Sequence, residues 1–273
     1  MPAVLRTVTA TRYVTPLREG GSMPGLVEAD DDGLYVLKFR GAGQGPKALA
    51  AELVAGEVAR TLGLPVPELV LVVLDPALGA AEPDPEIQEL IAASGGTNLG
   101  MDFLPGALPF TPARPPGAEL AADVVWFDAY VLNVDRTPRN PNLLRWHHAL
   151  WLIDHGAALY VHHATGDPVA RAGERFPAIR DHVLLPFAGP IAEADARLAP
   201  RLDGARLAAI AAALPGTWVA GDAYAAHLAA RLADREGFVE QVEGARREAR
   251  QGPGEAAGRL GGAPREGAAR ARG

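Results

Sequence analysis

Hydrophobic and polar residues alternate along short runs in the first third of the chain, a period of two that is typical of β-strands with one buried face. The runs cover residues 12–17, 26–30 and 34–40. Because Gly, Pro and Asp residues separate them, we expect three consecutive antiparallel strands. Residues 46–64 have a helical pattern, with Pro46 suited to the first turn and Gly63 to the C-terminal cap. Residues 65–75 form another strand pattern, so this part predicts a twisted sheet carrying one helix.

Helical patterns dominate the chain beyond a proline-rich stretch. Apolar residues recur at helical spacing in a helix that begins near Gly117. They are Leu120, Val124, Phe127 and Val131. Residues 143–146 and 150–154 are apolar runs on either side of two histidines, a pattern typical of a β-hairpin. Residues 205–215 and 223–247 predict further helices.

Together these patterns predict an α+β fold of two lobes. We expect residues 1–105 to form a small antiparallel β-sheet lobe with one helix, and residues 106–245 to form a mainly α-helical lobe. Residues 246–273 carry seven arginines against three glutamates, with Gly, Ala and Pro between them. Because this segment lacks apolar periodicity, we expect it to be a disordered tail.

Composition excludes several classes of function. The 273 residues are 48% hydrophobic and 22% charged, which is typical of a folded protein. There is no cysteine for a disulfide, a thiolate nucleophile or a cysteine metal site, and neither serine, Ser22 or Ser94, lies in a G-x-S-x-G setting. The net charge of −7 argues against a nucleic-acid partner. Without a long apolar run or a signal sequence, we expect a cytoplasmic protein with no membrane insertion.

The rarity of lysine marks a first candidate site. Only Lys38 and Lys47 occur among the 26 basic residues. Lys38 lies within an apolar strand pattern, where its compact charge suits contact with a buried phosphate; a lysine on the outer face of the sheet is the alternative. The next helix carries Glu52 and Glu57, which cannot share one face, so we expect one of them to meet Lys38. Kinases hold the lysine that contacts the ATP phosphates through such a pair.

A cluster of asparagines marks a second candidate site. The chain has four asparagines, and three of them surround Asp135. The four are Asn98, Asn133, Asn140 and Asn142, and the last three are those around Asp135. Asp135 precedes Asn140 by five positions, and Pro138 and Pro141 favour an extended loop there. A kinase catalytic loop has this spacing, because its aspartate accepts the proton of the acceptor hydroxyl and its asparagine binds magnesium.

The expected hairpin brings this loop toward a second acidic residue. Counting outward from the two histidines places Asn140 opposite Asp154 or its neighbour. Asp154 ends an apolar strand pattern and precedes a flexible turn. Carboxylate and amide oxygens, completed by substrate phosphates, suit Mg²⁺. We therefore expect Asn140 and Asp154 to bind the metal, with Asn142 as the alternative to Asn140.

In these elements the sequence resembles the HipA-like kinases and, more loosely, the phosphatidylinositol kinases. LYVLKF resembles the strand that carries the family's ATP-binding lysine, and Glu52 falls where the family has the glutamate that pairs with it. DRTPRN is similar to the family's D-R-x-x-x-N loop, with Thr137 in place of the usual histidine, and LIDHG resembles its metal-binding element. The likeness runs from about residue 12 to residue 158.

This resemblance implies a protein-kinase-like bilobal fold and an ATP- and magnesium-dependent phosphotransferase. Lys38, paired with Glu52, would hold the phosphates, and Asp135 would be the catalytic base. The magnesium ligands would be Asn140 and Asp154. The turn that covers the phosphates would contain Gly20, Gly21 and Ser22. The γ-phosphate of ATP would pass to a hydroxyl of a protein or small-molecule acceptor that the sequence does not identify.

Three other functions stay open on the residues alone. GAGQGP lies between a strand and a helix, as in dinucleotide-binding proteins, although Pro46 replaces the third glycine. Five histidines within seventeen residues suggest a metal hydrolase, but without an H-E-x-x-H pattern we expect turn or surface histidines. They are His147, His148, His155, His162 and His163. A non-catalytic nucleotide-binding module is the third possibility, although such a module needs no base.

Overall fold

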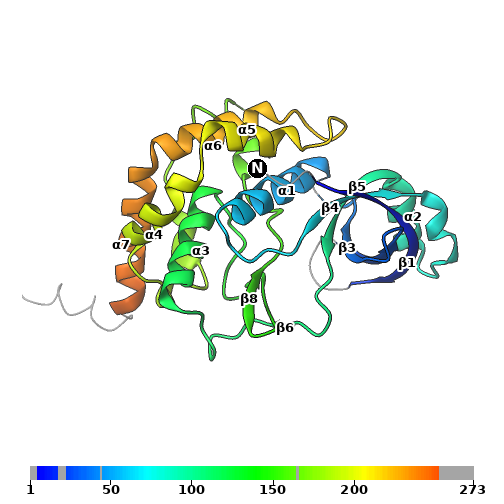
Figure 1. Cartoon of the computed structure of the whole chain (residues 1–273), viewed down its shortest axis with the longest axis horizontal. Helices are drawn as coiled ribbons and strands as arrows, with labels where there is room; N and C mark the ends of the chain where they lie inside the picture. The colour runs from blue at the N-terminus through cyan, green and yellow to red at the C-terminus, as the bar shows by residue number, and fades with distance from the viewer. Residues whose placement is uncertain (1–4, 18–22, 44, 164–165, 252–273) are drawn as a thin grey trace, which may run out of the picture.

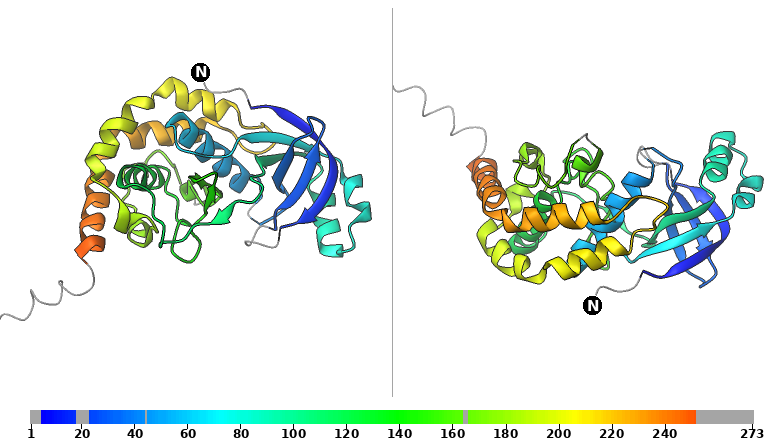
Figure 2. Two further views of the ribbon diagram at one scale, coloured as in Figure 1. Left: turned by 60° about the horizontal axis from the view of Figure 1, so that its bottom comes forward. Right: turned by 90° about the horizontal axis from the view of Figure 1, so that it is seen from above.

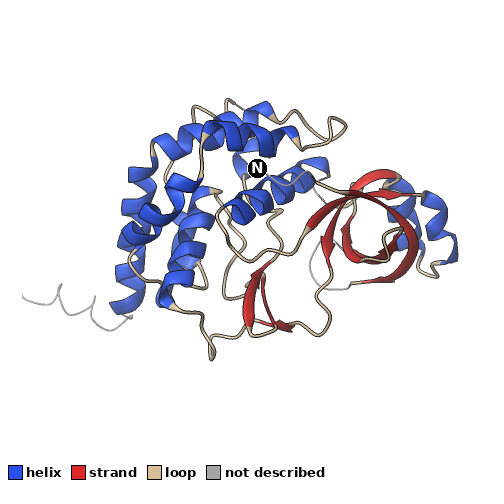
Figure 3. Ribbon diagram, viewed as in Figure 1, coloured by secondary structure: helices blue, strands red, loops and turns tan. Residues whose placement is uncertain are grey.

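The chain forms a β-barrel at one end and a helical body at the other (Figure 1). It is described by a computed structural model that covers residues 5–17, 23–43, 45–163 and 166–251. The two further views show the same division, with the last helix at the end remote from the barrel (Figure 2). Colouring by secondary structure shows most of the strands gathered in the barrel (Figure 3). The predicted phosphate-covering residues Gly20, Gly21 and Ser22 lie outside the described residues.

Five strands close the barrel in the order β1-β2-β3-β5-β4. Their bounds are β1 (Thr7–Pro16), β2 (Gly25–Ala29), β3 (Leu34–Lys38), β4 (Leu69–Leu74) and β5 (Gly96–Asp102). The first three pair antiparallel in sequence order, as their alternating patterns predict. The sheet is closed rather than open because β4 returns to pair with β1 in parallel, with Thr7 opposite Leu71. This closure leaves the described barrel strands without an unpaired edge.

The barrel end carries more helix than the single one expected from the sequence. A 3-10 helix, η1 (Pro76–Ala81), and a helix, α2 (Pro85–Ala93), follow β4. Each begins with an aspartate cap and a proline in the first turn, Asp75 for η1 and Asp84 for α2. Ile87 and Ile91 of α2 pack with the residues that fill the barrel. The expectation of one helix was wrong because this helix is short and its apolar face has only these two residues.

Helix α1 (Pro46–Thr61) joins the two ends of the molecule. Every residue from Leu49 to Ala59 is buried, so the helix lies inside the protein rather than on its surface. Pro46 lies in its first turn, and Gly63 just beyond it has a φ of +78°, the left-handed conformation that favours glycine. Its apolar residues belong to the core of the helical body, not to the smaller core inside the barrel. Leu69, Leu99 and Met101 of β4 and β5 belong to that same core, so α1 also packs against the outside of the barrel.

The helical body surrounds a small sheet of three strands. Its helices are α3 (Ala118–Tyr130), α4 (Ile191–Leu198), α5 (Gly204–Ala212), α6 (Asp222–Ala233) and α7 (Arg235–Gln251). The sheet contains β6 (Leu108–Pro109), β7 (Leu143–Trp146) and β8 (Ala149–Leu152). Strands β7 and β8 form the predicted hairpin, with His147 and His148 at its turn, both with positive φ. In the part of this body that the structure describes, short 3-10 helices connect these elements: η2 (Tyr160–His163), η3 (Pro177–Asp181), η4 (Leu185–Phe187) and η5 (Ala199–Arg201).

Helix α7 extends further than the sequence predicted. The disordered tail was expected to begin at residue 246, but α7 runs to Gln251. Val242 and Ala245 are buried on its inner face, and Arg246 pairs with Glu243 one turn earlier. These contacts continue the helix past the predicted boundary, while residues 252–273 lie outside the described part of the chain. Within the described residues, no helix has the length and apolar character needed to cross a membrane.

Candidate active site

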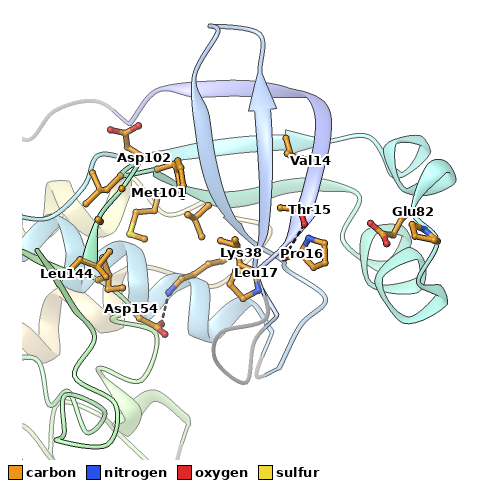
Figure 4. Close-up of a pocket in the computed structure, with 18 residues that line it drawn as sticks. Val14, Thr15, Pro16, Leu17, Lys38, Glu82, Met101, Asp102, Leu144 and Asp154 are labelled. Atoms are coloured by element: carbon orange, nitrogen blue, oxygen red, sulfur yellow. Dashed lines mark hydrogen bonds and ion pairs between the residues drawn. The ribbon is translucent and has the colours of Figure 1, made fainter. Parts of the chain in front are cut away.

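Lys38 lies at the end of β3 and points toward the helical body. Its Nζ is 2.6 Å from Glu52 Oε2 and 2.6 Å from Asp154 Oδ1, and its side chain is only 11% exposed. Figure 4 shows the side chain of Lys38 reaching Asp154, with a dashed line marking their contact. The alternative of a lysine on the outer face of the sheet is therefore wrong. Burial lowers the pKa of an amine, but the two carboxylates raise the pKa of Lys38 above its ordinary value.

Glu52 is the glutamate of α1 that meets this lysine. Five residues separate it from Glu57, which places the two side chains on different sides of the helix, and Glu57 pairs with Arg60 instead. Burial would raise the pKa of Glu52, yet Lys38 and His155 hold it well below its usual range. At Glu57, burial raises the pKa. Glu52 is therefore a charged partner inside the protein.

Asp154 follows β8 in a left-handed backbone conformation, with a φ of +55°. Its side chain is 40% exposed, so one carboxylate of the pair on Lys38 is open to the pocket while the other, Glu52, is closed off. Gly156 lies close to both, because a Cβ there would be 3.4 Å from Glu52 Oε2 and 3.8 Å from Asp154 Oδ1. The segment after β8 thus packs directly against α1.

All three asparagines of the second candidate site contact Asp135, and Asn133 Oδ1 accepts from its main-chain nitrogen at 3.2 Å. Asn140 Nδ2 donates to Asp135 Oδ2 at 2.8 Å. Asn142 Nδ2 donates to the main-chain oxygen of Asp135 at 3.0 Å and to Oδ2 at 3.3 Å. The hairpin register brings Ile153, one residue before Asp154, onto Asn142, whose carbonyl accepts from Ile153 N at 3.1 Å. This is the register that counting outward from His147 and His148 predicts, with Leu143 opposite Leu152, although the side chain of Asn140 itself bonds Asp135.

Two adjoining cavities connect these residues. The larger has a volume of about 830 Å³ and extends from Lys38 and Asp154 between apolar residues of the barrel and the hairpin (Figure 4). Those residues include Val36, Met101, Leu144 and Ile153. The smaller, of about 320 Å³, is lined by Lys38, Asp135 and Asp154 together with the glycine-rich loop before α1. The apolar walls of the larger cavity suit a flat apolar group. The smaller cavity is lined by the charged side chains of Lys38, Asp135 and Asp154.

The comparisons with known proteins agree with this geometry. The sequence matches the family model of the HipA-like kinases over residues 11–170, which contain both candidate sites. The chain belongs to the HipA-like kinase family. It is therefore a kinase, and the metal hydrolase and dinucleotide-binding alternatives are set aside. The glycine-rich loop GAGQG follows β3, which pairs antiparallel with both of its neighbours, whereas a dinucleotide-binding loop follows a strand of a parallel sheet.

Solved kinase structures share the fold. The Helicobacter pylori proinflammatory kinase CtkA superposes with a TM-score of 0.57 at 14% identity, covering 89% of this chain and 99% of that one. The Golgi casein kinase superposes with a TM-score of 0.51 at 13% identity, covering 93% of this chain and 75% of that one. A second crystal structure of the Golgi casein kinase, with Mn/ADP bound, gives the same TM-score and identity and covers 76% of that chain. No curated protein matches this kinase.

A buried network behind the loop that carries Asp135 was missed by the sequence analysis. Asp128 of α3 is fully buried and accepts from Arg136 Nε at 2.5 Å. Arg136 also donates to the carbonyl of Asn142 at 2.5 Å and to that of Ile153 at 3.5 Å. One guanidinium therefore ties the loop that carries Asp135 to the strand that leads to Asp154. The D-R dipeptide was visible in the sequence, but its partner Asp128 was not.

His182 completes this network from a distant segment. Its Nε2 is 2.8 Å from Asp128 Oδ2, and its Nδ1 accepts from the main-chain nitrogen of Leu184 at 3.0 Å. The ring is therefore neutral, with its proton on Nε2. Burial lowers the pKa of His182 despite the nearby carboxylate, and Asp128, which burial would push up, has its pKa held below the usual range by Arg136 and His182.

The histidines of the kinase do not gather into a metal site. Within the described residues, no group of three or more His, Asp or Glu side chains is arranged to hold a metal ion. His147 and His148 are exposed at the hairpin turn, as expected, and His162 stacks on Tyr224 with ring centroids 3.8 Å apart. His155 departs from the expectation, because only 1% of it is exposed.

Proposed function

We propose that this kinase transfers the γ-phosphate of ATP to a hydroxyl group in a reaction that depends on Mg²⁺. The observation that carries the proposal is the placement of Lys38 between Glu52 and Asp154, where the two cavities meet, with Asp135 on the wall of the smaller cavity. An ammonium held in this way is set to contact phosphates. The carboxylate of Asp135, on the wall of the smaller cavity, is suited to accept a proton.

The nucleoside would occupy the larger cavity. Val36 of the barrel and Leu144 and Ile153 of the hairpin region give this cavity the apolar walls that a purine ring prefers. The phosphates would then extend toward Lys38. With the two lobes expected from the sequence, residues 1–105 would supply most of the nucleotide contacts, and residues 106–245 would supply the loop with Asp135 and the proposed metal ligands.

The donor set fits a magnesium ion. Asp154 offers a carboxylate open to the cavity, and exposed Asn140 keeps its amide oxygen available while its Nδ2 bonds Asp135. Two protein oxygens are enough, because Mg²⁺ completes its shell with phosphates and water. When bound, the ion neutralises charge that develops on the phosphates. Asn142 is the weaker candidate ligand, since its amide is anchored to the main chain of Asp135.

Asp135 would act as the catalytic base. Its Oδ2 accepts from both asparagines, whereas Oδ1 accepts no hydrogen bond from the described residues. Oδ1 would take the proton of the acceptor hydroxyl as the hydroxyl oxygen bonds to the γ-phosphorus. The bond between that phosphorus and the β–γ bridging oxygen then breaks, and ADP leaves with the electron pair. Arg136 and Asp128 hold the loop in place during this step.

The acceptor, a protein or a small molecule, is found by tracing the phosphate. The protein is incubated with [γ-³²P]ATP and Mg²⁺, first alone and then with a cell extract separated into protein and metabolite fractions. We expect label to move from ATP into one fraction, and the same fraction to stay unlabelled with Asp135→Asn. A protein that gains stability from Mg²⁺-ATP but transfers no phosphate to either fraction would instead be a non-catalytic nucleotide-binding module.

A further inference from the structure

We propose that His155 is a positioning residue, which donates from Nδ1 to Glu52 Oε1 and thereby keeps Glu52 Oε2 on Lys38. This inference rests on the proposed function only where it concerns ATP and Mg²⁺. The residue itself was expected at a flexible turn, and the structure places it in the interior between α1 and α3.

Unpartnered polar atoms carry the inference. Glu52 Oε1 and both ring nitrogens of His155 are buried and form no hydrogen bond with the described residues. His155 Nδ1 lies 3.6 Å from Glu52 Oε1, slightly beyond hydrogen-bond distance. Buried polar groups nearly always find hydrogen-bond partners. Glu52 Oε1 lacks a donor and a protonated His155 Nδ1 lacks an acceptor, so each atom can serve as the partner of the other. A small closure of the segment after β8 onto α1 completes the bond.

The surroundings fix the histidine ring in this orientation. Phe127 of α3 packs edge to face against it, with ring centroids 5.6 Å apart and an interplanar angle of 76°. Phe127 is itself fully buried. On either side in the sequence, Asp154 bonds Lys38 and Gly156 lies against Glu52. The ring therefore cannot move without moving the segment that carries the proposed metal ligand.

The bond has a consequence for the metal. Lys38 Nζ lies 2.6 Å from each of two carboxylates, Glu52 and Asp154. If Glu52 turns away, Lys38 keeps only Asp154, the residue that Mg²⁺ needs. By holding Glu52 on the lysine, His155 leaves Asp154 free to exchange its partner for the metal. Loss of the ring nitrogen should therefore raise the Mg²⁺ requirement rather than only lower the overall rate.

The first test needs neither metal nor nucleotide. The chain has two lysines, so protein labelled with ¹³C-lysine gives two ε-carbon signals, which Lys47→Arg assigns. We expect His155→Phe, which keeps a ring against Phe127, to shift the Lys38 signal, and His155→Asn, whose amide replaces the Nδ1 donor, to restore it. Exposed His163 supplies a matched control, since His163→Phe should leave the Lys38 signal unchanged. An unchanged Lys38 signal in His155→Phe would overturn the proposal.

A measurement on the unmodified protein keeps the proposal testable if the variants fold poorly. Long-range ¹H–¹⁵N spectra distinguish the two neutral forms of a histidine ring. We expect His155 to carry its proton on Nδ1, and a proton on Nε2 alone would contradict the inference.

The second test titrates Mg²⁺ against ATP binding by calorimetry. We expect His155→Phe to raise the Mg²⁺ concentration for half-maximal ATP binding at least fivefold and His155→Asn to reverse most of this change. In a Glu52→Ala background, His155→Phe should add nothing, because residue 52 then has no side-chain oxygen to accept from His155. An equal Mg²⁺ requirement in the wild type and His155→Phe would refute the role of His155. Wild-type protein that binds no Mg²⁺-ATP would instead refute the proposed function, and the lysine spectra would still decide on His155.

Discussion

At the scale of single residues, the two asparagines on Asp135 have different tasks. Asn140 is exposed and bonds only the side chain of Asp135 and its own loop. Asn142 is 8% exposed, has a φ of +48° and bonds the main chain of Asp135. Asn140 is therefore suited to bind the metal and Asn142 to shape the loop. The spacing in the sequence had left either asparagine possible as the ligand.

This difference predicts distinct effects for two matched variants. Asn140→Ala should lower turnover about tenfold or more and raise the Mg²⁺ requirement, with little change in melting temperature, because it removes an exposed ligand. Asn142→Ala should cost about 1–3 kcal/mol of unfolding free energy, since it removes a partly buried hydrogen bond and strains a left-handed backbone position. Thermal unfolding and Mg²⁺ titrations on both variants check this. An Asn142→Ala variant that alone raises the Mg²⁺ requirement would reverse the assignment.

At the scale of elements, α1 presents two buried glutamates to different surroundings, and this yields a second prediction. Glu52→Gln should weaken Mg²⁺-ATP binding about tenfold, because the Lys38 ammonium loses a charged partner. Glu57→Gln should leave nucleotide affinity unchanged, since Glu57 pairs with Arg60 away from the cavities. Calorimetric titration of Mg²⁺-ATP into the two variants makes the comparison. Equal losses of nucleotide affinity in both variants would mean that the substitutions act by disturbing α1 and not by breaking the Lys38–Glu52 ion pair.

The elements that the sequence predicted are those whose patterns are local. β1 to β3, α1, α3 and the β7–β8 hairpin each show their own period, and Lys38 and Glu52 lie on two of them. β5 was not predicted, because its glycines and asparagine resemble a loop, and it becomes a strand only by pairing with β3 on one side and β4 on the other. Closure of the barrel depends on the same long-range pairing.

The missed parts of the site depend on contacts between distant segments. His182 lies 54 residues from Asp128 in the sequence, yet bonds its side chain. Likewise, His155 was expected at a flexible turn because its burial against α1 and α3 leaves no mark in the local pattern. Asp135 was found from the spacing of its loop and Asp154 from its place at the end of a strand. The buried residues that hold them in place follow no recognisable spacing in the sequence.

At the scale of the whole molecule, three histidines make stability depend on pH. Burial lowers the pKa of His182 and His227 below 6.5, and that of His162 to about 4. Such groups are neutral in the folded state but take up a proton in the unfolded state, so their contribution to stability is complete above pH 6.5. It is lost as the pH falls below 6.5 toward the folded pKa.

The unfolding free energy should therefore fall between pH 6.5 and about pH 4, by at most about 1.4 kcal/mol per pH unit for each histidine. Urea unfolding at several pH values measures this slope. His148→Asn serves as a control, since this histidine is exposed at the hairpin turn and asparagine tolerates its positive φ. A stability that stays constant over this range would contradict the neutral, buried state of the three rings.

The whole molecule brings a lysine from the barrel, a glutamate from α1 and two aspartates from the helical body to one place. The central claim is that this constellation transfers phosphate with Asp135 as its base. It is tested most directly by measuring phosphate release from [γ-³²P]ATP and ATP affinity side by side in the wild type and Asp135→Asn. We predict that turnover falls by ~10²–10⁴ while ATP affinity changes little, because the variant keeps the shape of the loop but cannot take the proton. Full turnover in Asp135→Asn would contradict the account.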